Sequence, residues 1–160
     1  GRRINKRWRG GRVVSKIDIA KDVRFLQTAL AVARIWSKDP SSQVAAIAVG
    51  DTPNQVAWGY NGFPPGIADT PERLADRDTK YRLTRHAEPN ALSNAWFPVR
   101  TLYVTHHPCA DCVIDILAAR TVKRVVFVFN ETFEERWHES LKVARALLSE
   151  GGISIEGVVL

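Results

Sequence analysis

Helical and strand patterns alternate through the second half of this chain, and this alternation constrains its fold more than any other feature. Three helical patterns and three short β-prone runs follow one another at 85–96, 101–105, 110–119, 124–129, 133–148 and 153–159. Strands joined through helices usually lie parallel, with the helices packed on the faces of the sheet. We therefore expect a partly parallel sheet with helices on both faces.

The first half of the chain adds one helix and one hairpin. Apolar residues recur three or four apart between Asp18 and Ser37, which is typical of one buried helix face. Two short β-prone runs, 43–49 and 55–60, are separated by turn-forming residues and indicate an antiparallel pair. The whole pattern predicts a three-layer α/β/α sandwich around a mixed five-stranded sheet. The long Pro- and Gly-bearing stretch 61–84 is expected to frame a ligand.

Positive charge is concentrated at the beginning of the chain. The net charge is +6, yet residues 1–16 contain seven Arg and Lys side chains and no acid, so the remaining residues carry −1. We therefore expect residues 1–16 to form a flexible basic leader and residues 17–160 to form a single catalytic domain. Because the body lacks excess positive charge, nucleic acid is a disfavoured partner.

Composition also bears on compartment. No apolar run approaches membrane-spanning length, and residues 1–16 lack the apolar core of a secretory signal. The chain has only two cysteines, which argues against a disulfide-stapled secreted scaffold. We expect a cytoplasmic protein without a membrane partner.

Chemistry is concentrated in two short clusters at expected helix starts. His86-Ala87-Glu88 is followed by Pro108-Cys109-Ala110-Asp111-Cys112. One imidazole and two thiolates suit Zn²⁺, and three protein ligands leave the fourth tetrahedral position to water, as in catalytic sites. A helix start lowers the pKa of Cys109 and Cys112, which makes thiolates available. The sequence predicts a zinc site formed by His86, Cys109 and Cys112.

Glu88 is the candidate acid–base residue of this site. Its position two residues after His86 can place a carboxylate beside the water on zinc without making it a ligand. A structural zinc knuckle would explain the thiols, but it gives Glu88 no role. We therefore favour a catalytic site.

The order of these residues resembles the H-x-E…P-C-x-x-C signature of zinc nucleobase deaminases. Three further segments are similar to deoxycytidylate (dCMP) deaminases: Ser37-Lys38-Asp39-Pro40-Ser41-Ser42-Gln43-Val44, Gly59-Tyr60-Asn61-Gly62-Phe63-Pro64, and Asp76-Arg77-Asp78-x-Lys80-Tyr81. The similarity runs from about Asp18 to Val159.

This resemblance implies a cytidine deaminase-like fold and the hydrolytic deamination of dCMP to dUMP and ammonia, which supplies dUMP for thymidylate synthesis. It also implies a homo-oligomer. Asn61 is expected to contact the deoxyribose, and Lys38, Ser37 and Ser41 are expected to lie near the 5′-phosphate. Ala87 and Tyr81 complete the expected substrate contacts.

Three alternatives remain open at this stage. The substrate could be another cytosine nucleotide, such as dCTP or a C5-substituted dCMP. It could also be a base within RNA or DNA, although this would require a basic groove with stacking aromatic residues. A non-enzymatic zinc module would bind metal without releasing ammonia.

Overall fold

The computed structural model describes residues 6–9, 12–15 and 20–160. Its elements follow in the order β1 (Lys6–Arg9), β2 (Arg12–Ser15), α1 (Ala20–Trp36), β3 (Ala45–Val49), β4 (Val56–Tyr60), α2 (Pro71–Ala75), α3 (Arg77–Leu83), α4 (Ala87–Asn94), β5 (Thr101–Val104), α5 (Ala110–Ala118), β6 (Arg124–Val128), α6 (Glu131–Arg136), α7 (His138–Glu150) and β7 (Ser154–Val159). The strands form one seven-stranded sheet in the order β2-β1-β7-β6-β5-β3-β4.

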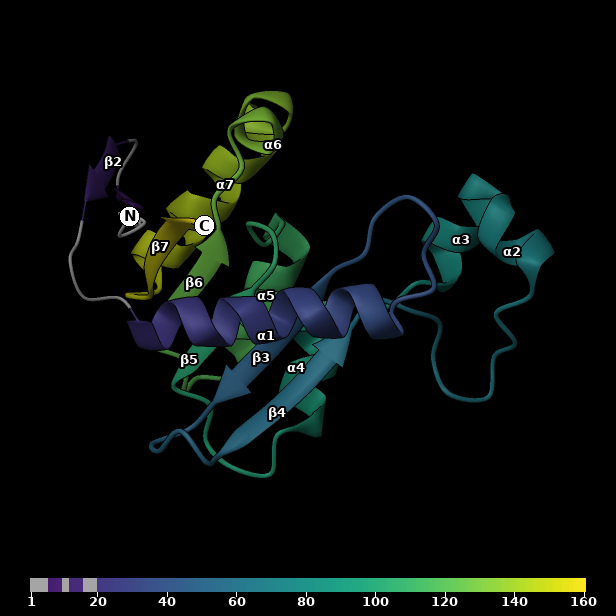
Figure 1. The fold of residues 1–160 in the computed structure, drawn as a ribbon, viewed down its shortest axis with the longest axis horizontal. Coiled ribbons are helices and arrows are strands. Elements are labelled where there is room, and N and C mark those ends of the chain that lie inside the picture. Colours follow the sequence, from purple (N-terminus) through teal and green to yellow (C-terminus); the bar gives the residue numbers. More distant parts are fainter. Residues whose placement is uncertain (1–5, 10–11, 16–19) are drawn as a thin grey trace.

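The sheet is mixed and covered by helices on both faces, as the sequence predicts (Figure 1). β5, β6 and β7 pair in parallel through crossovers that contain α5 and α7. β3 pairs antiparallel with both β4 and β5. The three-layer sandwich is confirmed, with seven strands in place of the expected five.

Side chains alternate between the two faces of each strand and form two separate cores. On one face α1 buries Leu26, Ala29 and Ala33 against alternate residues of the sheet, namely Ala45, Ile47, Val49, Tyr103, Val126 and Val158. The intervening residues pack beneath α4, α5 and α7, among them Ala46, Ala48, Leu102, Val104, Val125 and Phe127. Because side chains of a strand alternate between faces, each inner strand contributes to both cores.

The two additional strands lie in the stretch that we expected to be a flexible leader, and the structure corrects that expectation. β1 pairs antiparallel with β7, with Trp8 opposite Gly157. Arg7 and Trp8 are buried, and Arg7 forms ion pairs with Asp22 and Glu156. A count of charges cannot distinguish a solvated arginine from one that meets two buried carboxylates. The rest of the expected leader, residues 1–5, 10–11 and 16, lies outside the described residues.

The stretch 61–84 contains two short helices. Thr70 caps α2 and Asp76 caps α3, each through a side-chain oxygen that accepts a backbone N–H. Helices of five and seven residues are too short to show apolar periodicity, so the sequence pattern did not predict them. Within the part of the chain that the structure describes, no helix is both long and apolar enough to cross a lipid bilayer.

Candidate metal centre and active site

The structure brings His86, Cys109 and Cys112 together. His86 occupies the N-cap position of α4, Cys109 occupies that of α5, and Cys112 lies in the first turn of α5. His86 Nδ1 lies 3.1 Å from Cys112 Sγ and 3.7 Å from Cys109 Sγ. The three ligand atoms all lie within 4.8 Å of one another, and His86 is exposed. The cluster therefore opens to solvent on the side of His86.

These distances fit one tetrahedral zinc ion. Zinc bonds of about 2.0–2.3 Å hold neighbouring nitrogen and sulfur ligands roughly 3.5 Å apart. One imidazole and two thiols also form a donor set that zinc prefers. The residues present therefore fit the metal that the sequence predicts.

The pKa values of the two cysteines are shifted in opposite directions. A hydrogen bond from the Cys112 thiol is the main cause that lowers the pKa of Cys109 to about 4, and a further hydrogen bond from His86 adds to it. The same pairing with Cys109, together with burial, raises the pKa of Cys112. The hydrogen bond with Cys109 raises the pKa of His86. These opposite shifts favour the thiolate form at Cys109 over Cys112.

Glu88 is buried beside this cluster. It is 4% exposed and lies in the first turn of α4, where its carboxylate interacts with the thiol of Cys112. Burial is the main cause that raises the pKa of Glu88 above its ordinary value. A carboxylate with a raised pKa is a stronger base, which suits a group that takes up and returns a proton.

The approach of α4 to the sheet depends on Gly59. A Cβ atom at this position would lie 2.3 Å from the backbone nitrogen of Ala91 and 2.7 Å from the carbonyl oxygen of Ala87. Only glycine allows β4 to pack this closely against the helix that carries Glu88. Ala87, an expected substrate contact, is fully buried at this junction.

Asn61 and Ser37 are hydrogen-bonded to each other. The Ser37 hydroxyl donates to Asn61 Oδ1 at 2.6 Å, and the Val44 backbone N–H donates to the same oxygen at 2.9 Å. Asn61 Nδ2 donates to the Ser42 carbonyl at 2.8 Å. Both residues are buried. Ser37, in the loop that follows α1, therefore orients Asn61, which directly follows β4.

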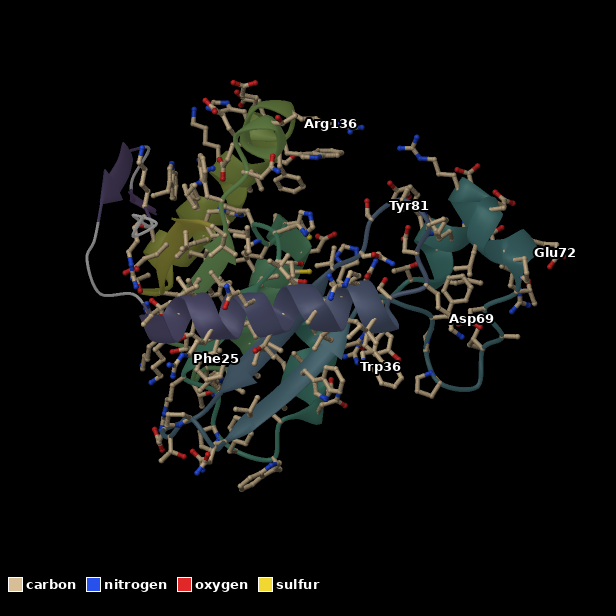
Figure 2. All side chains as sticks on the ribbon, viewed as in Figure 1. Phe25, Trp36, Asp69, Glu72, Tyr81 and Arg136 are labelled. Atoms are coloured by element: carbon tan, nitrogen blue, oxygen red, sulfur yellow. The ribbon has the colours of Figure 1, made fainter. Side chains whose placement is uncertain are left out.

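Lys38 lies at the solvent end of the same region. Its ammonium group is 2.9 Å from the Asp69 carboxylate, and its side chain is 68% exposed. Lys38, Asp69 and Asn61 line one pocket of about 90 Å³. Trp36 is the last residue of α1, and Asp69 lies beyond this end of the helix (Figure 2).

Lys80 was not predicted as a site residue, although it lies in the segment 76–81 that is similar to dCMP deaminases. Its buried ammonium donates to Asp39 at 3.0 Å and to the Ser41 hydroxyl at 2.7 Å. Ser41 and Tyr81, both expected substrate contacts, line a separate pocket of about 400 Å³ together with Pro40, Leu74, Ala75, Arg77 and Lys80. Lys38 and Ser41, both expected near the phosphate, therefore line different pockets, and Ser37 lines neither of the two.

The sequence matches a known family model. The model of the cytidine and deoxycytidylate deaminase zinc-binding region matches residues 19–129, a range that includes every residue of the cluster. An uncharacterized deaminase of Aliivibrio fischeri is 35% identical over 134 residues, which are 82% of this chain and 89% of that protein. The deoxycytidylate deaminase of Mus musculus is 37% identical over 128 residues, which are 74% of this chain and 68% of the mouse protein.

A solved structure has the same fold. The crystal structure of a dCMP deaminase from the cyanophage S-TIM5 superposes with a TM-score of 0.62 and covers 87% of this chain and 98% of its own. Its sequence is 23% identical, so this likeness supports the architecture alone.

Proposed function

The chain belongs to the family of zinc-binding cytidine and deoxycytidylate deaminases, and from this premise we propose that it hydrolyses dCMP to dUMP and ammonia. The reaction would supply dUMP for thymidylate synthesis. The observation that carries the proposal is the cluster of His86, Cys109 and Cys112 at two helix starts, with the buried carboxylate of Glu88 beside it.

His86, Cys109 and Cys112 would hold the zinc ion, which supplies a Lewis acid that activates water for attack. Glu88 would accept the proton that this water gives up and deliver it to N3 of the cytosine ring. The same carboxylate would then assist the loss of ammonia from C4. Because Glu88 is buried, it stays close to the reacting atoms and away from competing solvent.

Asn61 and Lys38 would bind the sugar and the phosphate. They line the same pocket, and one N–H of the Asn61 amide is not needed for its bond to the Ser42 carbonyl. The ion pair of Lys38 with Asp69 is exposed, so exchanging that partner for a phosphate costs little. Ser37 would act by orienting Asn61, and Ser41 by its hydrogen bond with Lys80. Ala87 and Tyr81 remain proposed contacts from the resemblance.

Lys38→Met is expected to raise the KM for dCMP by about 10–100-fold, the equivalent of one lost hydrogen bond to a charged group. Turnover of deoxycytidine, which has no phosphate, should change little. Steady-state kinetics on both substrates measures this, with Lys142→Met on the exposed surface of α7 as the control. An equal loss on both substrates would contradict a phosphate-binding role for Lys38.

Ammonia release across a panel of substrates tests the proposed function. The panel comprises dCMP, deoxycytidine, dCTP, 5-methyl-dCMP and single-stranded DNA and RNA oligonucleotides that contain cytosine. We expect dCMP to have the highest kcat/KM. A higher value for an oligonucleotide would favour deamination within nucleic acid, and zinc binding without ammonia release from any substrate would identify a non-enzymatic zinc module.

The chain would form a homo-oligomer through an aromatic face made of Trp36, Trp58 and Tyr60. These side chains are 50%, 43% and 38% exposed. Trp36 contacts the rings of Trp58 and Tyr60 at centroid distances of 5.9 and 6.3 Å. β4 is an edge strand of the sheet, and Trp36 at the end of α1 packs against its side chains. Clustered exposed rings are typical of interfaces, and a second copy offers a self-complementary surface.

Trp58→Ser is expected to shift the chain toward the monomer in sedimentation velocity at micromolar concentration. Trp137→Ser is the matched control, because Trp137 is 42% exposed but lies outside the aromatic face. A wild-type monomer, or an oligomer that persists in Trp58→Ser, would argue against this interface.

A reducing compartment such as the cytoplasm would suit this function. Both cysteines are free of disulfide bonds, and both are assigned to the metal. Oxidation of either sulfur would remove a ligand.

A further inference from the structure

His107 has contacts that the proposed chemistry does not use. It is 3% exposed and precedes Pro108 and the first sulfur ligand, Cys109. Arg145 Nε lies 3.3 Å from His107 Nε2. Since an arginine N–H only donates, Nε2 must accept, and the proton of the neutral ring lies on Nδ1. His107 Nδ1 therefore donates to the Pro108 carbonyl oxygen, which is 2.8 Å away.

Arg145 is itself held by two other groups. Its guanidinium pairs with the Glu134 carboxylate and lies 4.5 Å from the ring centroid of Trp8. Arginine over an indole face is a favourable contact, and it is strongest where water is excluded. Trp8 is 6% exposed, so this contact is largely sheltered.

Trp8 is also connected to His107 through the ring of Phe127. The Trp8 ring meets the edge of Phe127 at a centroid distance of 6.1 Å. The Phe127 ring meets that of His107 at 4.8 Å. One residue of β1 thus supports the imidazole both through Arg145 and through the core.

We propose that Trp8, Arg145 and His107 form a positioning chain that links the docking of β1 to the geometry of the zinc ligands. His107 holds the Pro108 carbonyl, and Pro108 leads directly into the N-cap residue Cys109. Arg145 fixes the tautomer and orientation of His107, and Trp8 fixes Arg145. All three are positioning residues, and the inference rests on the metal site of the proposed function.

The rate of zinc release tests the positioning chain of Trp8, Arg145 and His107 without relying on catalysis. Trp8→Leu and Arg145→Leu are each expected to accelerate zinc transfer to a chelator by about 10–100-fold, the usual effect of lost support around a metal ligand. The ligand-field spectrum of the Co²⁺-substituted protein should change as well. The double variant should release zinc at about the same rate as the faster of the two single variants, because both changes interrupt the same positioning chain. Trp8→Phe and Arg145→Lys serve as milder variants if the leucine variants fail to fold.

Two controls separate positioning from general destabilisation. Leu26→Ala removes a buried side chain on the α1 face of the sheet, so it should lower stability but leave zinc release unchanged. His107→Asn can keep a donor where Nδ1 lies and should release zinc more slowly than His107→Leu. If the variants match the wild type in zinc release and in the cobalt spectrum, the positioning chain is overturned and the metal site stands. If the wild type binds neither metal, the proposed function fails and the inference fails with it.

Discussion

Glu88→Gln is expected to lower the kcat for dCMP by about 10²–10⁴-fold, the typical contribution of a positioned acid–base group. Glutamine keeps the shape of the side chain but cannot take up the proton and return it. Because Glu88 is not one of the three proposed zinc ligands, the variant should keep its zinc and its fold. Stopped-flow or single-turnover measurement of ammonia release, combined with metal analysis, tests both expectations.

The exposed Glu150→Gln on α7 is the control for this experiment, since it makes the same chemical change far along the chain from the cluster. It should retain wild-type turnover. A zinc-loaded Glu88→Gln protein that deaminates dCMP at a rate near that of the wild type would remove Glu88 from the mechanism. Loss of zinc in this variant would contradict the assignment of Glu88 as a residue outside the ligand set.

Asp22→Asn is expected to lower the free energy of unfolding by about 3–5 kcal/mol, because it removes one partner of a buried ion-pair network. Asp22 is 5% exposed and pairs with Arg7 and Arg124. It also accepts a hydrogen bond from the Tyr103 hydroxyl at 2.8 Å. Urea unfolding at neutral pH measures the loss. Asp51→Asn breaks the exposed pair with Arg100 and should cost less than about 1 kcal/mol.

The effect of Asp22→Asn should depend on pH in a defined direction. Burial alone would raise the pKa of Asp22, but hydrogen bonds from Arg124 and Tyr103 outweigh it, so the pKa lies below its ordinary value of 3.8. A lowered folded-state pKa stabilises the protein above the unfolded-state pKa, and this stability is lost as pH falls through the folded-state value. The difference between wild type and Asp22→Asn should therefore shrink below about pH 4. A difference that stays constant down to pH 3 would contradict the charged role of Asp22.

The zinc cluster could be predicted because its members are defined by short spacings at helix starts. Cys109 directly precedes α5 and Cys112 lies in its first turn, and His86 and Glu88 flank the start of α4. Local sequence determines where such helices begin, so the ligands could be chosen before the fold was known. The structure adds that the two helix starts meet, with His86 Nδ1 3.1 Å from Cys112 Sγ.

Charged residues outside that cluster were harder to interpret. Lys38 and Lys80 look alike in the sequence, yet one ammonium is exposed beside Asp69 and the other is buried against Asp39. Asp39 is 41 residues away from Lys80 along the chain. Such a partner is decided by the packing of α3 against the loop after α1, and no local pattern encodes it.

Local sequence patterns were enough to predict the alternation of helices and strands, the helices on both faces of the sheet and the four residues of the proposed catalytic centre. That Arg7 and Trp8 belong to the folded protein follows from contacts that no local pattern encodes. Arg7 meets a carboxylate 149 residues away in Glu156, and Trp8 meets Arg145 and Phe127. The physical reason is that periodicity and helix starts are local properties of the chain, whereas the environment of a charge or a ring depends on residues that only folding brings near.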